Sequence, residues 1–283
     1  MSQLDDITLL CEGVHQGEDV VLLEAARATL EGRLPIARHV TIRPAGSKLD
    51  LPSAMRALRA LQQSLRVFAV RDRDFLRVDH VRTARAKALS LDTREQELRP
   101  YPLRQHCIES YLLDPPFLEE ALGDDLKAAG IDLGSTLDRL AEERCWSDVC
   151  TGAIEAASRQ MRDRDRPSRK ADVHTREEAI QEVKAALSRY ETRVHDVVST
   201  CDVAAEVDAL TADFSADGPL WTRVHGSEML LALEQQLRVM PRFKGGNLKN
   251  RLLTHAAYGA TPEPLVEEME ALLLQIQAAT RDR

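Results

Sequence analysis

Several features that would assign this chain to a specialised class are missing from it. No apolar run approaches the ~20 residues that a membrane-spanning helix needs, and the acidic start, MSQLDD, has no signal-peptide core. The five cysteines form an odd set without close pairs, which favours reduced thiols over a disulfide framework. We therefore expect a cytoplasmic protein that makes no contact with a membrane.

Aromatic residues are also scarce, at 4%, and acidic residues outnumber basic ones, which gives a net charge of -8. Few aromatics disfavour a single-strand-binding protein that depends on base stacking, and the negative charge argues against a protein that coats DNA electrostatically. Neither excludes an enzyme that meets nucleic acid through metal ions and a local basic patch. At 283 residues, 43% of them hydrophobic, the chain can form one large domain or two.

The first 115 residues alternate short apolar runs with amphipathic segments. This pattern predicts strands at 7–11, 40–43 and 66–70, separated by helices at 19–31 and 52–64. Connections of this length indicate parallel strands joined by crossover helices. A basic helical segment at 78–91 and a fourth strand at 103–108 are expected before Pro115-Pro116, where we place a domain boundary.

The remaining residues, 116–283, predict helices alone. We expect them at 117–129, 136–164, 177–199, 227–239, 248–258 and 262–279, with a polar linker at 166–174. Narrow apolar seams on the late helices would allow a homodimer. The expected architecture is therefore an α/β domain with a short, mostly parallel sheet, residues 1–115, followed by an α-helical C-terminal region, residues 116–283.

Acidic residues directly follow two of the predicted strands. Glu12 follows the first, and Asp72 and Asp74 follow the third. Because the carboxyl ends of parallel strands lie at one edge of a sheet, we expect these three carboxylates to converge there. Such oxygen donors suit Mg²⁺ or Mn²⁺, which can activate water for phosphodiester hydrolysis. A second Asp-x-Asp, Asp163 and Asp165, follows a helical segment and is interpreted as a solvated helix end.

These motifs resemble the Toprim signature shared by topoisomerases, bacterial primases and OLD-type nucleases. Glu12-Gly13 and Asp72-Arg73-Asp74 are similar to its two short motifs, in the same order and strand context, over roughly residues 5–115. The segment IESYLL, 108–113, resembles one found in Toprim-like nucleases that accompany ABC-type or AAA-type ATPases in phage defence.

The resemblance implies more than the residues alone do. It implies a Toprim-like Rossmannoid fold, a Mg²⁺- or Mn²⁺-dependent endonuclease acting on DNA or RNA, an antiviral role and an ATPase partner. It also makes Glu109 a fourth candidate among the catalytic and metal-binding carboxylates.

The chain departs from the family pattern at two places. The acidic residue expected at the start of the first helix is Asp19 or Glu18, because the loop after Glu12-Gly13 is longer here. The Gly-Lys of the nuclease relatives has its counterpart at Gly226-Ser227, so a lysine that would neutralise transition-state charge is absent at that position. The candidates to supply this charge and to contact a nucleic-acid backbone are Lys48, Lys244 and Lys249.

Two other hypotheses stand beside the nuclease. Ser227 at the lysine position favours a catalytically degenerate Toprim-fold subunit that binds or senses within an ATPase complex. A primase or topoisomerase fragment is the weaker alternative, because the chain has neither zinc-binding cysteines nor a tyrosine in a cleavage-domain context.

Overall fold

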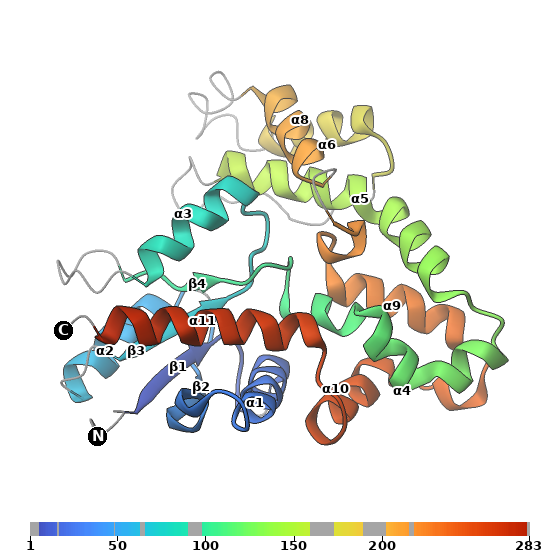
Figure 1. Ribbon diagram of the computed structural model, residues 1–283. Helices are drawn as coiled ribbons and strands as arrows, with labels where there is room; N and C mark the ends of the chain where they lie inside the picture. Colours follow the sequence, from blue (N-terminus) through green and yellow to red (C-terminus); the bar gives the residue numbers. More distant parts are fainter. Residues whose placement is uncertain are drawn as a thin grey trace.

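The described part of the molecule contains a small parallel sheet surrounded by helices (Figure 1). The computed structural model describes residues 6–15, 17–47, 49–62, 66–89, 98–158, 173–188, 202–214 and 218–281. Within these ranges four parallel strands pair in the order β2-β1-β3-β4. They are β1 Ile7–Cys11, β2 Val40–Pro44, β3 Val67–Arg71 and β4 Tyr101–Pro102. The predicted α/β class with a short parallel sheet is confirmed.

Helices connect the strands and then make up the rest of the described chain. Those of the first part are α1 Glu18–Leu30, η1 Pro35–His39, α2 Leu51–Gln62, α3 Val78–Ala88 and the 3₁₀ segment η2 Ile108–Leu113. Those of the second part are α4 Pro115–Ala128, α5 Leu133–Ser158, α6 Arg176–Ser188, α8 Val203–Phe214, η3 Leu220–Thr222, α9 Gly226–Leu237, η4 Pro241–Phe243, α10 Leu248–Tyr258 and α11 Glu263–Arg281.

The two central strands, β1 and β3, are buried on both faces because they are almost entirely apolar, whereas β2 exposes Thr41 and Arg43. In β3, Phe68 and Val70 join the main core, whereas Val67 and Ala69 pack with Leu51 of α2 in a smaller core on the other face. This alternation is the period-2 geometry of a strand. It explains why β1 and β3 read as continuous apolar runs in the sequence, as buried parallel strands do.

The predicted strand at 103–108 is wrong. The β4 strand ends at Pro102, and the chain then turns into η2, whose Tyr111, Leu112 and Leu113 are buried in the main core. Proline has no N–H to extend a ladder, and a buried 3₁₀ segment has the same apolar composition as a buried strand. The sequence analysis also missed α8, which packs on α5 together with α6 (Figure 1).

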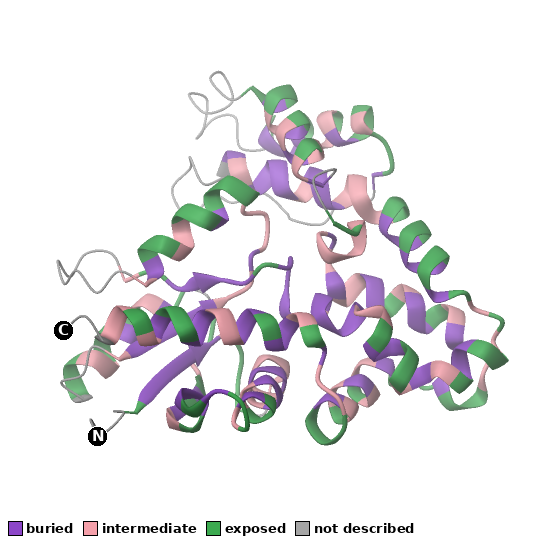
Figure 2. Ribbon diagram, viewed as in Figure 1, coloured by how far each residue is buried: buried purple, intermediate pink, exposed green. Residues whose placement is uncertain are grey.

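The main hydrophobic core continues across residue 115. It includes Ile7 of β1 and Ile276 of α11 in a single cluster, and α10 and α11 both pack against α1. Figure 2 shows the strands buried and the outer faces of the helices exposed. The two parts of the chain therefore share apolar surface, and the proposed boundary near residue 115 stays a prediction.

Two expectations from composition concern thiols and membrane spans. The cysteines among the described residues are free thiols: Cys11, Cys107, Cys145 and Cys150. None of the helices in the described ranges combines the length and the apolar character needed to cross a membrane. The ends of two predicted helices, beyond Ser158 and Ser188, and the Asp163/Asp165 pair lie outside the described residues.

Candidate active site

Asp72 and Asp74 directly follow β3, and the chain fixes both at the end of that strand. The Asp72 Oδ1 accepts a hydrogen bond of 2.9 Å from the backbone N–H of Ile108. The backbone N–H of Asp74 donates to the carbonyl of His106 at 2.8 Å, and Asp74 itself adopts a positive φ of 50°. Aspartate tolerates this left-handed conformation better than most residues. The segment 106–108 therefore holds the turn that presents the two carboxylates.

Glu12 lies at the same edge of the sheet, where β1 ends beside β3. Its Oε1 accepts a hydrogen bond of 3.3 Å from the backbone N–H of Asp72. The following residue, Gly13, has φ of 92° and exchanges two backbone hydrogen bonds with Gly46, 2.7 and 3.1 Å long. This bridge joins the ends of β1 and β2. The structure thus brings Glu12 to the Asp72 segment, as the strand order predicts.

Asp19 and Glu109 complete a cluster of carboxylates from four parts of the chain. Burial raises the pKa of Asp72 well above its ordinary value, and Asp19, Asp74, Glu109 and Glu12 raise it further through their negative charges. Burial also raises the pKa of Asp19 to about 7, with Glu109 and Glu12 adding to the effect. Each ionised carboxylate is therefore destabilised by its neighbours, and a bound cation would reduce this repulsion.

Three helices begin at this cluster. Glu18 and Asp19 lie in the first turn of α1, Ser227 is the second residue of α9, and Lys249 is the second residue of α10. The positive ends of the helix dipoles therefore lie close to the carboxylates. Part of the negative charge gathered here is compensated by backbone N–H groups rather than by basic side chains.

Lys249 is the basic side chain that reaches this cluster. Its Nζ lies 2.5 Å from the Glu18 Oε1 and 3.6 Å from the Glu109 Oε1. Burial alone would lower the pKa of Lys249, but its pairing with Glu18 and Glu109 outweighs burial and raises it. The ammonium group is therefore held in its charged form beside two carboxylates.

Ser227 contacts one of the carboxylates of the cluster. Its hydroxyl donates a 2.6 Å hydrogen bond to the Glu109 Oε1. Burial would raise the pKa of Glu109, but hydrogen bonds to its carboxylate, that of Ser227 first, outweigh burial and lower the value to about 2. Glu109 is therefore an anion in this cluster, and the serine orients it.

The donor set fits a divalent cation in chemistry, although the side chains as they stand do not form a closed ligand shell. No three His, Cys, Asp or Glu side chains of the described residues are placed so that together they could hold a metal ion. Mg²⁺ usually keeps several waters and takes only one or two carboxylates directly. Buried carboxylates whose pKa values are raised by mutual repulsion suit such a partly hydrated ion.

Comparison with known proteins identifies no relative. No protein-family model matches the chain, and no curated protein matches it significantly. The likeness to Toprim proteins therefore depends on the short sequence motifs alone.

The other predicted residues have different outcomes. Lys48 lies outside the described residues. Lys244, after η4, is exposed and is not brought to the carboxylates by any contact within the described chain.

The sequence analysis missed the contact between Ser227 and Glu109. The two residues are 118 positions apart, and no periodicity or strand rule connects them. The feature of the sequence that could have indicated this contact is Gly226. A Cβ at Gly226 would lie 2.4 Å from the Ser110 nitrogen, so only glycine allows α9 to approach η2 this closely.

Proposed function

We propose that this protein is a divalent-metal-dependent nuclease with a Toprim-like fold. The observation that carries the proposal is the convergence of Glu12, Asp19, Asp72, Asp74 and Glu109 at the carboxyl edge of a parallel sheet. Carboxylates are the donors that Mg²⁺ and Mn²⁺ prefer, and this edge is where open α/β sheets bind ligands. The reaction would be hydrolysis of phosphodiester bonds in DNA or RNA.

Each residue has a definite task in this proposal. One or two of the carboxylates of Asp72, Asp74 and Glu12 would bind a partly hydrated cation directly. The remaining carboxylates, with Glu109 and Asp19, would accept hydrogen bonds from its water molecules. A bound Mg²⁺ or Mn²⁺ supplies charge stabilisation and a more acidic water. Lys249 stays charged beside Glu109 and would neutralise negative charge that develops on the phosphoryl oxygens.

The biological setting is a proposal from resemblance. The motifs Glu12-Gly13 and Asp72-Arg73-Asp74 resemble the Toprim signature, and IESYLL resembles a segment of Toprim-like nucleases that accompany ABC-type or AAA-type ATPases. We infer an effector of a bacterial anti-phage defence system whose nuclease an ATPase partner restrains or releases. Antiviral function would then depend on both proteins.

Replacing Asp72 with asparagine tests the proposal directly. Asp72→Asn keeps the acceptor for the Ile108 N–H but removes the charge. We therefore expect the rate of cleavage of plasmid, single strands or tRNA in Mg²⁺ or Mn²⁺ to fall by two orders of magnitude or more. This is about the effect of losing one major electrostatic contribution to catalysis. Asp124→Asn is the matched control, because Asp124 is exposed on α4. Equal cleavage by the wild type and Asp72→Asn would refute the assignment.

The second candidate is a catalytically degenerate binding or sensor subunit. Ser227 at the lysine position and its hydrogen bond to Glu109 favour it. Calorimetric titration with Mn²⁺ separates the two functions. A nuclease should bind Mn²⁺ in the wild type and lose that binding in Asp72→Asn, whereas a degenerate site should show no Mn²⁺ binding that depends on Asp72.

A further inference from the structure

A cleft of about 1310 Å³ lies next to the carboxylate cluster. Every basic residue that lines it is an arginine: Arg73, Arg77, Arg82, Arg85, Arg104 and Arg223. These six face four carboxylates in the same lining, which leaves an excess of two positive charges in a protein whose net charge is -8. The cleft is therefore a local basic site on an acidic molecule.

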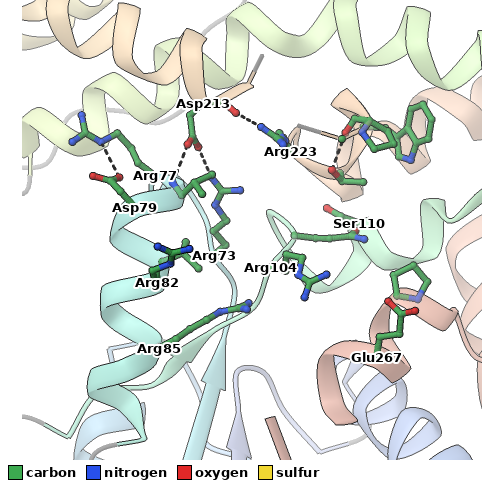
Figure 3. Close-up of a pocket in the computed structure, with 18 of the residues that line it drawn as sticks. Arg73, Arg77, Asp79, Arg82, Arg85, Arg104, Ser110, Asp213, Arg223 and Glu267 are labelled. Carbon is green, nitrogen blue, oxygen red and sulfur yellow. Dashed lines mark hydrogen bonds and ion pairs between the residues drawn. The ribbon is translucent and has the colours of Figure 1, made fainter. Parts of the chain in front are cut away.

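Two of these arginines have exposed side chains that a ligand can reach, although Arg104 is also paired with Glu268. Arg82 of α3 is exposed and has no hydrogen bond or ion pair among the described residues. The side chain of Arg104 is 67% exposed and lies 3.5 Å from Glu268. Figure 3 shows Arg82 and Arg85 on α3, with Arg104 across the cleft from them. By contrast, Arg73 is paired with Asp213 and Arg223 with the Asp213 carbonyl.

The cleft adjoins the candidate active site through two chain segments. Arg73 lies between Asp72 and Asp74, and Ser110 lines the cleft while its neighbour Glu109 belongs to the carboxylate cluster. The salt bridge of Arg73 to Asp213 fixes the segment 72–74, which separates the cleft from the carboxylate cluster. A polymer lying in the cleft would therefore contact Arg73 and Ser110, which are neighbours in sequence of Asp72, Asp74 and Glu109.

We infer that this cleft binds one strand of a nucleic acid and leads it to the carboxylate cluster. The choice of ligand rests on the proposed function. The cleft exceeds the roughly 300–1,000 Å³ of small-molecule pockets, which favours a polymer. The planar guanidinium fork matches phosphate oxygens in pairs. Trp221 also lines the cleft and offers one surface on which an unpaired base can stack.

Charge, rather than stacking, would supply most of the affinity. One tryptophan is much less than the aromatic platform of a dedicated single-strand-binding protein, in keeping with an aromatic content of 4%. Arginine contacts to phosphates bind without sequence preference and weaken as salt rises. The inference therefore predicts salt-sensitive, sequence-tolerant binding.

The test measures binding without catalysis. Fluorescence anisotropy of labelled oligothymidylate and oligouridylate is recorded in EDTA, between about 50 and 200 mM salt. Arg82→Glu/Arg104→Glu should weaken binding about tenfold or more and reduce the slope of log K against log salt by ~1.4, for two lost phosphate contacts. Arg38→Glu/Lys127→Glu makes the same change in charge outside the cleft. Its affinity and its salt dependence should both stay close to those of the wild type. Trp221→Ala should weaken binding about fivefold or more, and Trp221→Phe should retain it.

The outcomes separate this inference from the nuclease proposal. Equal binding by the cleft variant and its matched control would overturn the inference, even if cleavage still depends on Asp72. The inference would also be overturned if inorganic polyphosphate competed as strongly as an unlabelled strand and Trp221→Ala bound with unchanged affinity. The cleft would then be a general polyanion site. Binding that is lost in the cleft variant, in a protein that never cleaves, would support the inference and refute only the nuclease.

Discussion

At the scale of single residues, the carboxylate of Glu109 is contacted from two different helices. Ser227 of α9 hydrogen-bonds it, and the ammonium group of Lys249, on α10, lies 3.6 Å from it. Of the three lysines proposed from the sequence, Lys249 is the one that the described structure brings to the cluster. The site therefore keeps a positive charge although residue 227 is a serine.

Lys249→Met should lower kcat for phosphodiester cleavage about tenfold to a hundredfold or more, with a smaller effect on KM, because the charge acts on the transition state. Lys249→Arg should recover part of the loss. Lys244→Met removes an exposed lysine of the same region and should cleave like the wild type. Steady-state kinetics in Mg²⁺ measures all three, and a Lys249→Met enzyme with unchanged kcat would exclude lysine from the reaction.

At the scale of elements, three helix starts and two strand ends build the site, and their packing decides its geometry. The approach of α9 to η2 is the tightest of these contacts, because the position of Gly226 leaves no room for a side chain beside the backbone of Ser110. The same approach places Ser227 against Glu109. A change in this packing should therefore affect both stability and the orientation of a candidate ligand.

Gly226→Ala should lower the free energy of unfolding by about 1–3 kcal/mol, the usual cost of overpacking, because the new methyl group would lie 2.4 Å from the Ser110 nitrogen. Gly123→Ala is the matched control. Nothing lies within 4 Å of a Cβ at Gly123, inside α4, so alanine should stabilise that helix by up to about 1 kcal/mol. Urea denaturation compares them, and equal stability of the two variants would contradict the role assigned to Gly226.

The elements also show how far the sequence could predict this fold. β1 and β3 were predicted to within one residue, because buried parallel strands are short apolar runs bounded by polar residues. The strand rule also anticipated that Glu12 and Asp72 would meet. It failed for η2, which has the composition of a strand but the backbone of a 3₁₀ turn. The helix α8 did carry a usable pattern, with Val203, Val207, Leu210 and Phe214 buried along one side.

Contacts between remote elements were beyond the reach of such patterns. Ser227 meets Glu109, and Asp213 of α8 pairs with Arg73 over a separation of 140 residues. Local propensity says nothing about pairs this distant, which depend on how whole helices pack. The lining of the arginine cleft comes from α3, α8 and the η3 region. Of this cleft, the sequence predicted only the basic helical segment at 78–91.

At the scale of the whole molecule, the α/β part and the helical part share one core. The buried Glu268 of α11 lies 2.5 Å from Arg85 of α3 and 3.5 Å from Arg104, so an ion-pair network also spans the two parts. Shared apolar surface and shared ion pairs both favour cooperative unfolding. This packing argues that the two parts fold together even where the sequence suggests a boundary.

Leu9→Ala tests that cooperativity. Leu9 is fully buried in β1, and its truncation should cost about 2–5 kcal/mol. Both tryptophans, Trp146 and Trp221, lie beyond residue 115, so their fluorescence reports the helical part. If the parts unfold together, Leu9→Ala should lower the urea midpoints of tryptophan fluorescence and far-UV circular dichroism equally, whereas Leu61→Ala, at a site 80% exposed, should change neither. A fluorescence midpoint that stays at the wild-type value while the dichroism transition splits would show two independently folding domains, with a boundary where Pro115-Pro116 places it.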